Sequence, residues 1–94
     1  MKKPVVPSAL GVLLAKSRMD AGLSQKEVAD HLGYSTAQVV SDWERGIRSP
    51  PGPVYRKLIK LYQVSAESFY DAIVEERTVI LQNKVRKLLY SKGS

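Results

Sequence analysis

The fold is decided by residues 23–46, which read LSQKEVADHLGYSTAQVVSDWERG. Ser24 is a good N-cap residue, and Glu27 three positions later completes the pattern of a capping box, so we predict that a helix begins here. Gly33 marks its end, because glycine adopts the left-handed conformation that commonly closes a helix. Apolar residues fall at helical spacing between these two points. They are Val28, Ala29 and Leu32.

A second short helix is predicted directly after this one. Thr36 is its N-cap candidate, and Gly46 closes the segment. Its apolar stripe consists of Val39, Val40 and Trp43, of which Trp43 is expected in the core. Two helices joined by a tight turn that contains glycine form the helix-turn-helix pattern, in which the second helix enters a DNA groove. Helices this short do not persist alone, so they must pack on a third element.

The composition indicates one small globular domain. The chain has 94 residues, of which 44% are hydrophobic and 26% charged, and it contains no cysteine. Disulfide and cysteine–metal frameworks are therefore excluded, and the lack of cysteine suits a cytoplasmic protein. No apolar run approaches the roughly 20 residues that span a bilayer, and no signal-peptide core follows the basic N-terminus.

The sequence offers no catalytic, metal or cofactor site. The acidic residues are scattered, the serines lack a base partner, and no glycine-rich phosphate loop is present. His31 is the single histidine, and we expect it on the exposed face of the first helix of the motif. The five tyrosines are expected to pack at the edge of the core. We therefore predict a protein that is not an enzyme.

The net charge is +6, with a pI near 9.7, and the charge is unevenly distributed. Residues 1–60 hold ten basic and five acidic side chains, giving +5. Residues 61–76 hold four acidic side chains and no basic one, and residues 77–94 hold five basic and no acidic ones. A basic excess around a helix-turn-helix favours attraction to DNA phosphates, whereas charge alone is equally typical of a solvated surface.

The rest of the chain is predicted to be helical with short connections. Residues 1–7 form a proline-broken arm, and Ser8 caps a helix that runs to about Ala21. Residues 47–53 form a loop, because their prolines cannot propagate a helix, and another helix follows up to about Tyr62. Ser65 caps a fifth helix. Residues 8–73 then make up an all-α domain, and residues 74–94 form an extra C-terminal amphipathic helix with a basic tail.

The C-terminal segment carries an apolar seam of two heptads. The seam residues, at spacings of 4, 3, 4 and 3, are Val74, Thr78, Leu81, Val85 and Leu88. Such a stripe is buried either on its own domain or against a second chain. We favour dimerisation, and a monomeric protein remains the alternative.

Residues from about 8 to 70 resemble the DNA-binding domain of the phage repressor and Cro type, also called the XRE family. The features that carry the resemblance are Arg18, Gly22-Leu23-Ser24-Gln25, Val28-Ala29, Leu32-Gly33, Ser41-Asp42-Trp43-Glu44-Arg45-Gly46, Pro50 and Val64-Ser65. The resemblance implies a fold of five helices, of which the second and third form the helix-turn-helix. It also implies sequence-specific DNA binding, usually as a dimer on an inverted repeat. Compared with the usual pattern of the family, this chain has one more residue between Gly33 and Glu44. The turn is therefore expected to be longer by one residue, which makes Ser35 an alternative cap to Thr36.

The resemblance also assigns roles to individual residues. Arg18 and Glu44 resemble the partly buried ion pair of the family, which ties the first helix to the end of the third. Gln25 resembles the glutamine that contacts a DNA phosphate and can brace the recognition helix. Arg45 and Arg48 correspond to places where the family often touches the DNA backbone. Lys26 is a further phosphate candidate, and Arg56 and Lys57 are weaker ones.

Base-reading candidates lie on the predicted outward face of the recognition helix. They are Thr36, Ala37, Gln38, Ser41 and Asp42. Gln38 is the best of them, because its amide can pair bidentately with adenine, and Ala37 suits a thymine methyl group. Asp42 either accepts from a cytosine amino group or pairs with a nearby base such as Arg45.

We therefore predict a cytoplasmic transcriptional regulator, a repressor that binds double-stranded DNA as a dimer without a cofactor. The alternative is a protein-interaction module, such as an antitoxin that neutralises a partner protein through its C-terminal helix.

Overall fold

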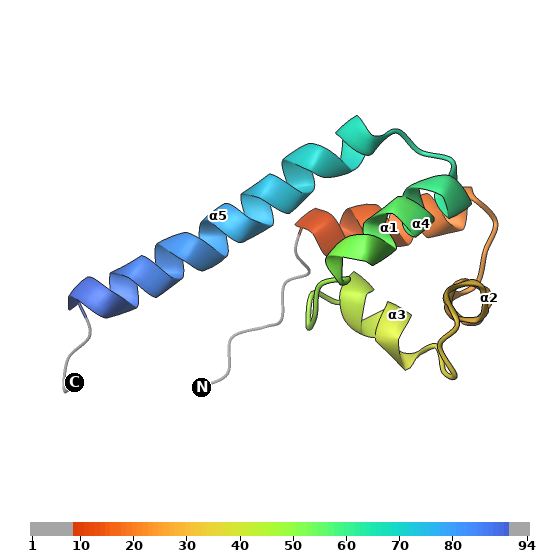
Figure 1. Ribbon diagram of the computed structural model, residues 1–94, viewed down its shortest axis with the longest axis horizontal. Coiled ribbons are helices and arrows are strands. Elements are labelled where there is room, and N and C mark those ends of the chain that lie inside the picture. Colours follow the sequence, from red (N-terminus) through yellow and green to blue (C-terminus); the bar gives the residue numbers. More distant parts are fainter. Residues whose placement is uncertain (1–8, 91–94) are drawn as a thin grey trace.

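The computed structural model describes residues 9–90, and this range contains five helices and no strand (Figure 1). The helices are α1 (Ala9–Asp20), α2 (Gln25–Leu32), α3 (Gln38–Glu44), α4 (Gly52–Tyr62) and α5 (Ala66–Tyr90). The all-α, five-helix prediction is thus confirmed. The predicted N-terminal arm, the predicted cap Ser8 and the end of the basic tail (residues 91–94) lie outside the described residues.

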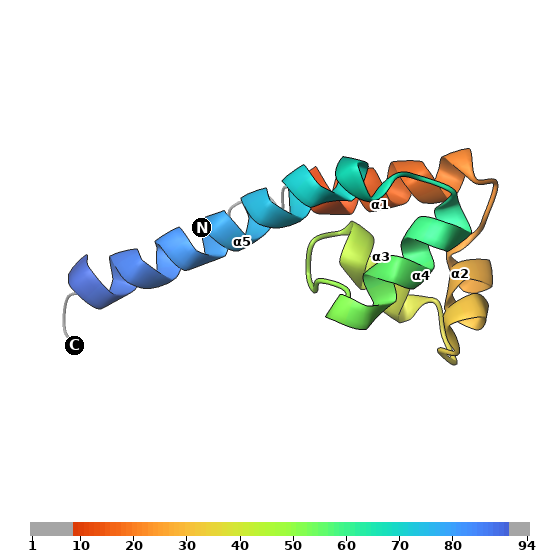
Figure 2. The same cartoon turned by 45° about the horizontal axis from the view of Figure 1, so that its top comes forward.

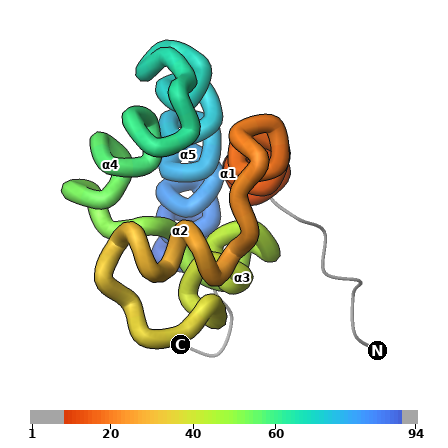
Figure 3. Tube along the Cα trace, turned by 90° about the vertical axis from the view of Figure 1, so that its right-hand side faces the viewer, coloured from red at the N-terminus to blue at the C-terminus, as the bar shows by residue number. Residues whose placement is uncertain are grey.

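The core lies where α1 packs against α3 and the start of α5, with α2 and α4 closing it. Figure 3 looks along α5 and shows α1 and α4 on either side of it, with α2 and α3 below. Each helix contributes at least one buried side chain. The largest that are fully buried are Phe69, Leu10, Leu14, Leu58, Val28 and Val40.

Trp43 occupies the core as expected, with 3% of its surface exposed. The ring of Tyr34 meets it edge-on, with 5.8 Å between ring centroids. Val39 packs at the border of the core, on the protein side of α3. Among the tyrosines, Tyr55 and Tyr62 are buried and Tyr34 is half-buried, as predicted for core-edge packing. The other two, Tyr70 and Tyr90, are exposed on α5 instead, so the prediction was wrong for them.

The capping pattern that opens the motif is present. The Ser24 hydroxyl accepts from the Glu27 backbone N–H at 3.0 Å, and the Glu27 carboxylate accepts from the Ser24 N–H at 2.8 Å. The bond from the Ser24 backbone N–H to the carboxylate, together with the Ser24 side chain, lowers the pKa of Glu27. Gly33 closes α2 in the left-handed conformation, with φ at 85°. The predicted helix and its two ends are therefore confirmed.

The start of α3 differs from the prediction. The N-cap position is Ala37, not Thr36, and Ala37 makes no side-chain capping bond. The Thr36 hydroxyl accepts from the Gln38 backbone N–H at 3.3 Å, two residues along instead of three. This short-range bond belongs to the turn before the helix, because threonine hydroxyls readily form such local bonds. The first residue of α3 is consequently Gln38.

The fifth helix and the C-terminal amphipathic helix form one continuous element of 25 residues. No glycine or proline interrupts residues 66–90, so nothing in the backbone stops the helix that Ser65 begins. The Ser65 hydroxyl accepts from the Ser68 backbone N–H at 3.3 Å, as expected of a cap. The first turns of α5 pack on the domain through Phe69, and the later turns project away from it (Figures 1 and 2).

Candidate nucleic-acid interface

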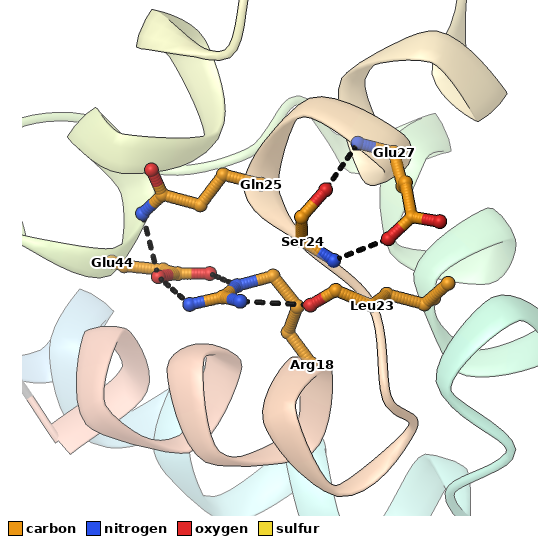
Figure 4. A network of polar contacts seen from close by, with 6 residues as sticks. All are labelled: Arg18, Leu23, Ser24, Gln25, Glu27 and Glu44. Atoms are coloured by element: carbon orange, nitrogen blue, oxygen red, sulfur yellow. Dashed lines mark hydrogen bonds and ion pairs between the residues drawn. The ribbon is translucent and has the colours of Figure 1, made fainter.

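A network of charged and polar groups joins α1, α2 and α3 (Figure 4). The Arg18 guanidinium donates through Nε to Glu44 Oε2 at 2.6 Å and through Nη2 to Glu44 Oε1 at 3.1 Å. Its Nη1 donates to the Leu23 carbonyl at 2.8 Å. The two side chains are only 14% and 7% exposed, and their mutual hydrogen bonds raise the pKa of Arg18. The pair fixes the end of α3 against α1.

Gln25 belongs to the same network. Its Nε2 donates to Glu44 Oε1 at 3.0 Å, so the first residue of α2 holds the last residue of α3 (Figure 4). The Gln25 side chain is half-buried. In this arrangement it braces the end of α3, and bracing this helix is one of the two roles that the family resemblance implies for it. Both ends of the helix-turn-helix are thus tied together by one carboxylate.

The structure separates the five base-reading candidates by exposure. Thr36 and Gln38 are exposed at the start of α3, and Ala37 and Ser41 are half-buried beside them. Asp42 is buried, with 7% of its surface exposed, although the spacing predicted an outward position. The prediction of an outward Asp42 is therefore wrong. The reason is electrostatic, because three neighbouring side chains fold over the carboxylate and cover it.

Those three side chains make Asp42 the centre of a second cluster. Its Oδ1 accepts from Gln38 Nε2 at 2.8 Å and from Arg45 Nη2 at 3.0 Å, and its Oδ2 lies 3.4 Å from Arg48 Nε. Hydrogen bonding by Gln38, together with the two arginines, lowers the pKa of Asp42. The Asp42 backbone carbonyl accepts from the Ile47 and Arg48 N–H groups as well. Of the two alternatives for Asp42, the structure shows the pairing with Arg45.

The candidate phosphate contacts surround the two helices of the motif. The Arg45 and Arg48 side chains are 55% and 69% exposed, so their ion pairs with Asp42 leave much of each guanidinium in solvent. Lys26 is exposed on α2 and pairs with Asp30 one turn later. Arg56 and Lys57 are exposed on α4. Lys26 can release Asp30 at low cost, because exposed ion pairs contribute little. Arg45 and Arg48 pair with the buried Asp42, and the exposed part of each guanidinium is what a phosphate could contact.

Gly11 is a structural residue that the sequence analysis missed. A Cβ atom at this position would lie 2.5 Å from the Glu44 carbonyl oxygen, which is backbone and cannot move aside easily. Glycine therefore lets α1 approach the end of α3 closely, at the place where Arg18 also holds it. A glycine inside an otherwise apolar helical pattern is the signal that could have drawn attention to it.

Other chemistries find no support within residues 9–90. No group of three or more metal-ligating side chains occurs there, and His31 is exposed on α2. None of the described helices is apolar enough over a sufficient length to cross a membrane.

The comparisons with known proteins agree with this geometry. A family profile described as a helix-turn-helix domain matches residues 9–69, which run from the start of α1 into the first turn of α5. The search of curated proteins gives no match. The profile covers well over half of the 94 residues. This chain therefore belongs to the helix-turn-helix domain family.

Proposed function

We propose that this chain is a transcriptional regulator of the phage repressor and Cro (XRE) type, which binds double-stranded DNA sequence-specifically and represses transcription in the cytoplasm. In this proposal α3 enters the major groove and the protein acts without a cofactor or a catalytic step. The observation that carries it is the placement of Gln38. Its amide is exposed on the first turn of α3, while Glu44 at the other end is anchored to Arg18 and Gln25.

The chemistry of this end of α3 suits base reading. An exposed glutamine amide can donate to adenine N7 and accept from adenine N6. Thr36, Ala37 and Ser41 lie beside it in the chain, and the four residues offer two hydroxyls, an amide and a methyl group to a few base edges. Rigid support behind the helix favours specificity, because a side chain that is already positioned loses less entropy on binding.

The cationic side chains around α3 suit the phosphates on either side of a groove. Arg45 and Arg48 lie at and just beyond the C-terminal end of α3, and Lys26 lies in the first turn of α2. In the proposal these groups contact the DNA backbone and fix the register, whereas Gln38 reads sequence. Each phosphate contact releases condensed counterions, so affinity falls steeply with salt.

The protein acts as a homodimer in this proposal. The seam residues Val74, Leu81, Val85 and Leu88 are 45%, 59%, 42% and 78% exposed on α5 and lack a partner within the described part of the chain. A symmetric dimer would read two half-sites about one helical turn, roughly 34 Å, apart.

A second candidate function rests on the same exposed seam. An antitoxin or another protein-interaction module would bury the seam against a different protein and use the helix-turn-helix in addition. Asp42 also keeps this candidate in play, because its carboxylate pairs with Arg45 and Arg48, two of the cations that DNA phosphates would need. A heterologous partner then replaces the second copy, and the mass of the isolated chain is that of a monomer.

Fluorescence anisotropy with labelled duplexes tests the proposed function. Duplexes selected from a random pool are compared with scrambled duplexes across a series of salt concentrations. The proposal predicts a preference of about a thousandfold or more for the selected site, together with a steep salt slope. Weak binding that is equal for both duplexes and vanishes near physiological salt would show that charge alone is acting, and would favour the protein-interaction alternative.

A further inference from the structure

The helix α5 has two apolar faces that point in different directions. Phe69, Ala72 and Ile73 face the domain core. Further along, Val79 and Ile80 line a shallow groove of about 400 Å³ with Leu10 and Ile47 of the same chain. The seam residues lie on the opposite side of the helix, as 100° per residue requires. Seam and core contact are therefore separate surfaces, and the seam stays exposed when the domain is fully folded.

The seam has the residue types of a two-stranded parallel coiled coil. With Val74 at position d, the a positions hold Thr78 and Val85, and the following d positions hold Leu81 and Leu88. β-Branched residues at a, combined with leucine at d, favour two parallel strands over three or four. The seam is also its own complement, because in a parallel pair each a or d residue meets the same residue of the other copy.

The charges beside the seam select the direction of the pair. The g positions hold Arg77 and Lys84, and the e positions hold Glu75, Gln82 and Leu89. In an antiparallel pair the g positions of the two helices lie beside each other, which brings Arg77 or Lys84 of one copy against Lys84 of the other. In a parallel pair a g residue lies beside an e residue instead, so Arg77 meets Gln82 and no like charges face each other.

We propose that two copies of this chain pair through the α5 seam in parallel and in register, so that both helix-turn-helix units lie at the same end of the coil. The inference rests on the proposed function only in taking a second copy of the chain as the partner. Both α3 helices then lie at the same end of the paired α5 helices, as a dimer that contacts one duplex requires.

Cysteine cross-linking tests the direction, since the chain contains no cysteine of its own. Three separate variants are prepared, V74C, L88C and N83C, and each is oxidised mildly at several protein concentrations. A disulfide forms only where the two Cα atoms come within about 7 Å. In a parallel pair residue 74 meets residue 74 and residue 88 meets residue 88. In either antiparallel register each of these pairs is about 15 Å or more apart along the axis.

The expected result is that V74C and L88C each become covalent dimers, whereas N83C, which is exposed on the outer face of α5, stays monomeric. L88C is the safer variant, because Leu88 is 78% exposed and its replacement leaves the core intact. The sedimentation mass of the unmodified chain should be twice 10.5 kDa at the same concentrations. Helical circular dichroism of each variant verifies that it is folded.

Two results would overturn the inference. Disulfides that form only in a mixture of V74C and V85C, or of L81C and V85C, and not within V74C or L88C alone, would show an antiparallel pair. A monomeric mass together with no cross-linking at any seam position would show that no pair forms. None of these readouts uses DNA, so the parallel pair can fail while DNA binding stands. A chain that cross-links as predicted and yet ignores DNA sequence would contradict only the DNA-binding part of the proposed function.

Discussion

The amide of Gln38 donates to the carboxylate of Asp42 at 2.8 Å, one turn further along α3. An amide nitrogen carries two hydrogens, so the second hydrogen and the Gln38 oxygen stay free for adenine. The bond therefore fixes which way the amide points before DNA arrives. At the same time the carboxylate partly neutralises Arg45 and Arg48, which are candidate phosphate contacts. We expect Asp42 to raise specificity and to restrain non-specific affinity.

Replacing Asp42 with alanine tests this expectation. The D42A variant should bind scrambled DNA more tightly and with a steeper salt slope, by roughly one unit per arginine freed, since each cation then contacts phosphate without competition. Its preference for the selected duplex should fall, because the Gln38 amide is no longer oriented. Anisotropy titrations across a salt series measure both effects. D30A, which removes an exposed acid that pairs with Lys26 on α2, is the matched control. An equal rise for D30A would show that the effect of D42A is one of net charge only.

The pair of Arg18 and Glu44 gives a prediction about stability. Replacing Glu44 with alanine leaves a largely buried guanidinium without its carboxylate and removes the acceptor of Gln25. The free energy of unfolding should fall by up to about 3–5 kcal/mol, the range for breaking one side of a buried pair. Urea unfolding followed by circular dichroism measures it. In contrast, D20A breaks the exposed pair of Lys16 and Asp20 and should cost less than about 1 kcal/mol. Similar losses for the two variants would contradict the structural role of Glu44.

Gly11 gives a prediction about close packing. Alanine normally stabilises a helix by about 1 kcal/mol over glycine, but here its methyl group would lie 2.5 Å from the Glu44 carbonyl. We expect G11A to be destabilised by about 1–3 kcal/mol, because α1 and α3 must separate. G52A is the matched control, since a Cβ there meets nothing within 4 Å. Thermal unfolding measures the stability of both variants. A G11A protein as stable as G52A would show that α1 and α3 can accommodate a methyl group at residue 11.

Acid should weaken the fold through Glu27 and Asp42. The pKa of each carboxyl is lowered in the folded protein, so the unfolded chain binds more protons between the folded and unfolded pKa values. The stability they contribute is therefore complete above the unfolded values of about 4 and is lost as the pH falls through the folded ones. Urea midpoints from pH 6 to pH 3 should decline. E27Q should flatten the decline, and an unchanged slope would show that the capping box adds nothing to acid sensitivity.

The local signals in the sequence predicted most of the fold. The capping roles of Ser24, Glu27 and Gly33 depend on contacts within a few residues of chain, so the amino-acid sequence alone predicts them. The start of α3 could not, because Thr36 bonds two residues ahead and the choice of cap depends on how the turn packs. The burial of Asp42 was missed for a similar reason. Helical spacing predicts the direction in which the Asp42 side chain points. It does not predict that Gln38, Arg45 and Arg48 fold over the carboxylate and bury it.

Some residues of the candidate site could also be predicted from the sequence, and others could not. The resemblance to repressors named Arg18, Glu44 and Gln25, and the structure joins all three in one network. The role of Gly11 could not be predicted from the sequence, because its neighbour Glu44 is 33 residues away in the chain and close only after folding. The single long α5 could not be predicted either. The residues of its two apolar faces alternate along the sequence. They can be told apart only when the side of α5 that packs on the core is known.

The most direct test of the central claim is the affinity of Q38A for the selected duplex and for duplexes that carry single base-pair changes across one half-site. The native chain should lose about 1–3 kcal/mol of binding free energy when the adenine that Gln38 reads is changed. Q38A should be indifferent to that change and should keep its discrimination at the other positions, whereas N83A, which removes an exposed amide from α5, should behave like the native chain. A Q38A protein whose sequence preference equals that of the native chain at every position would show that α3 does not read DNA through Gln38.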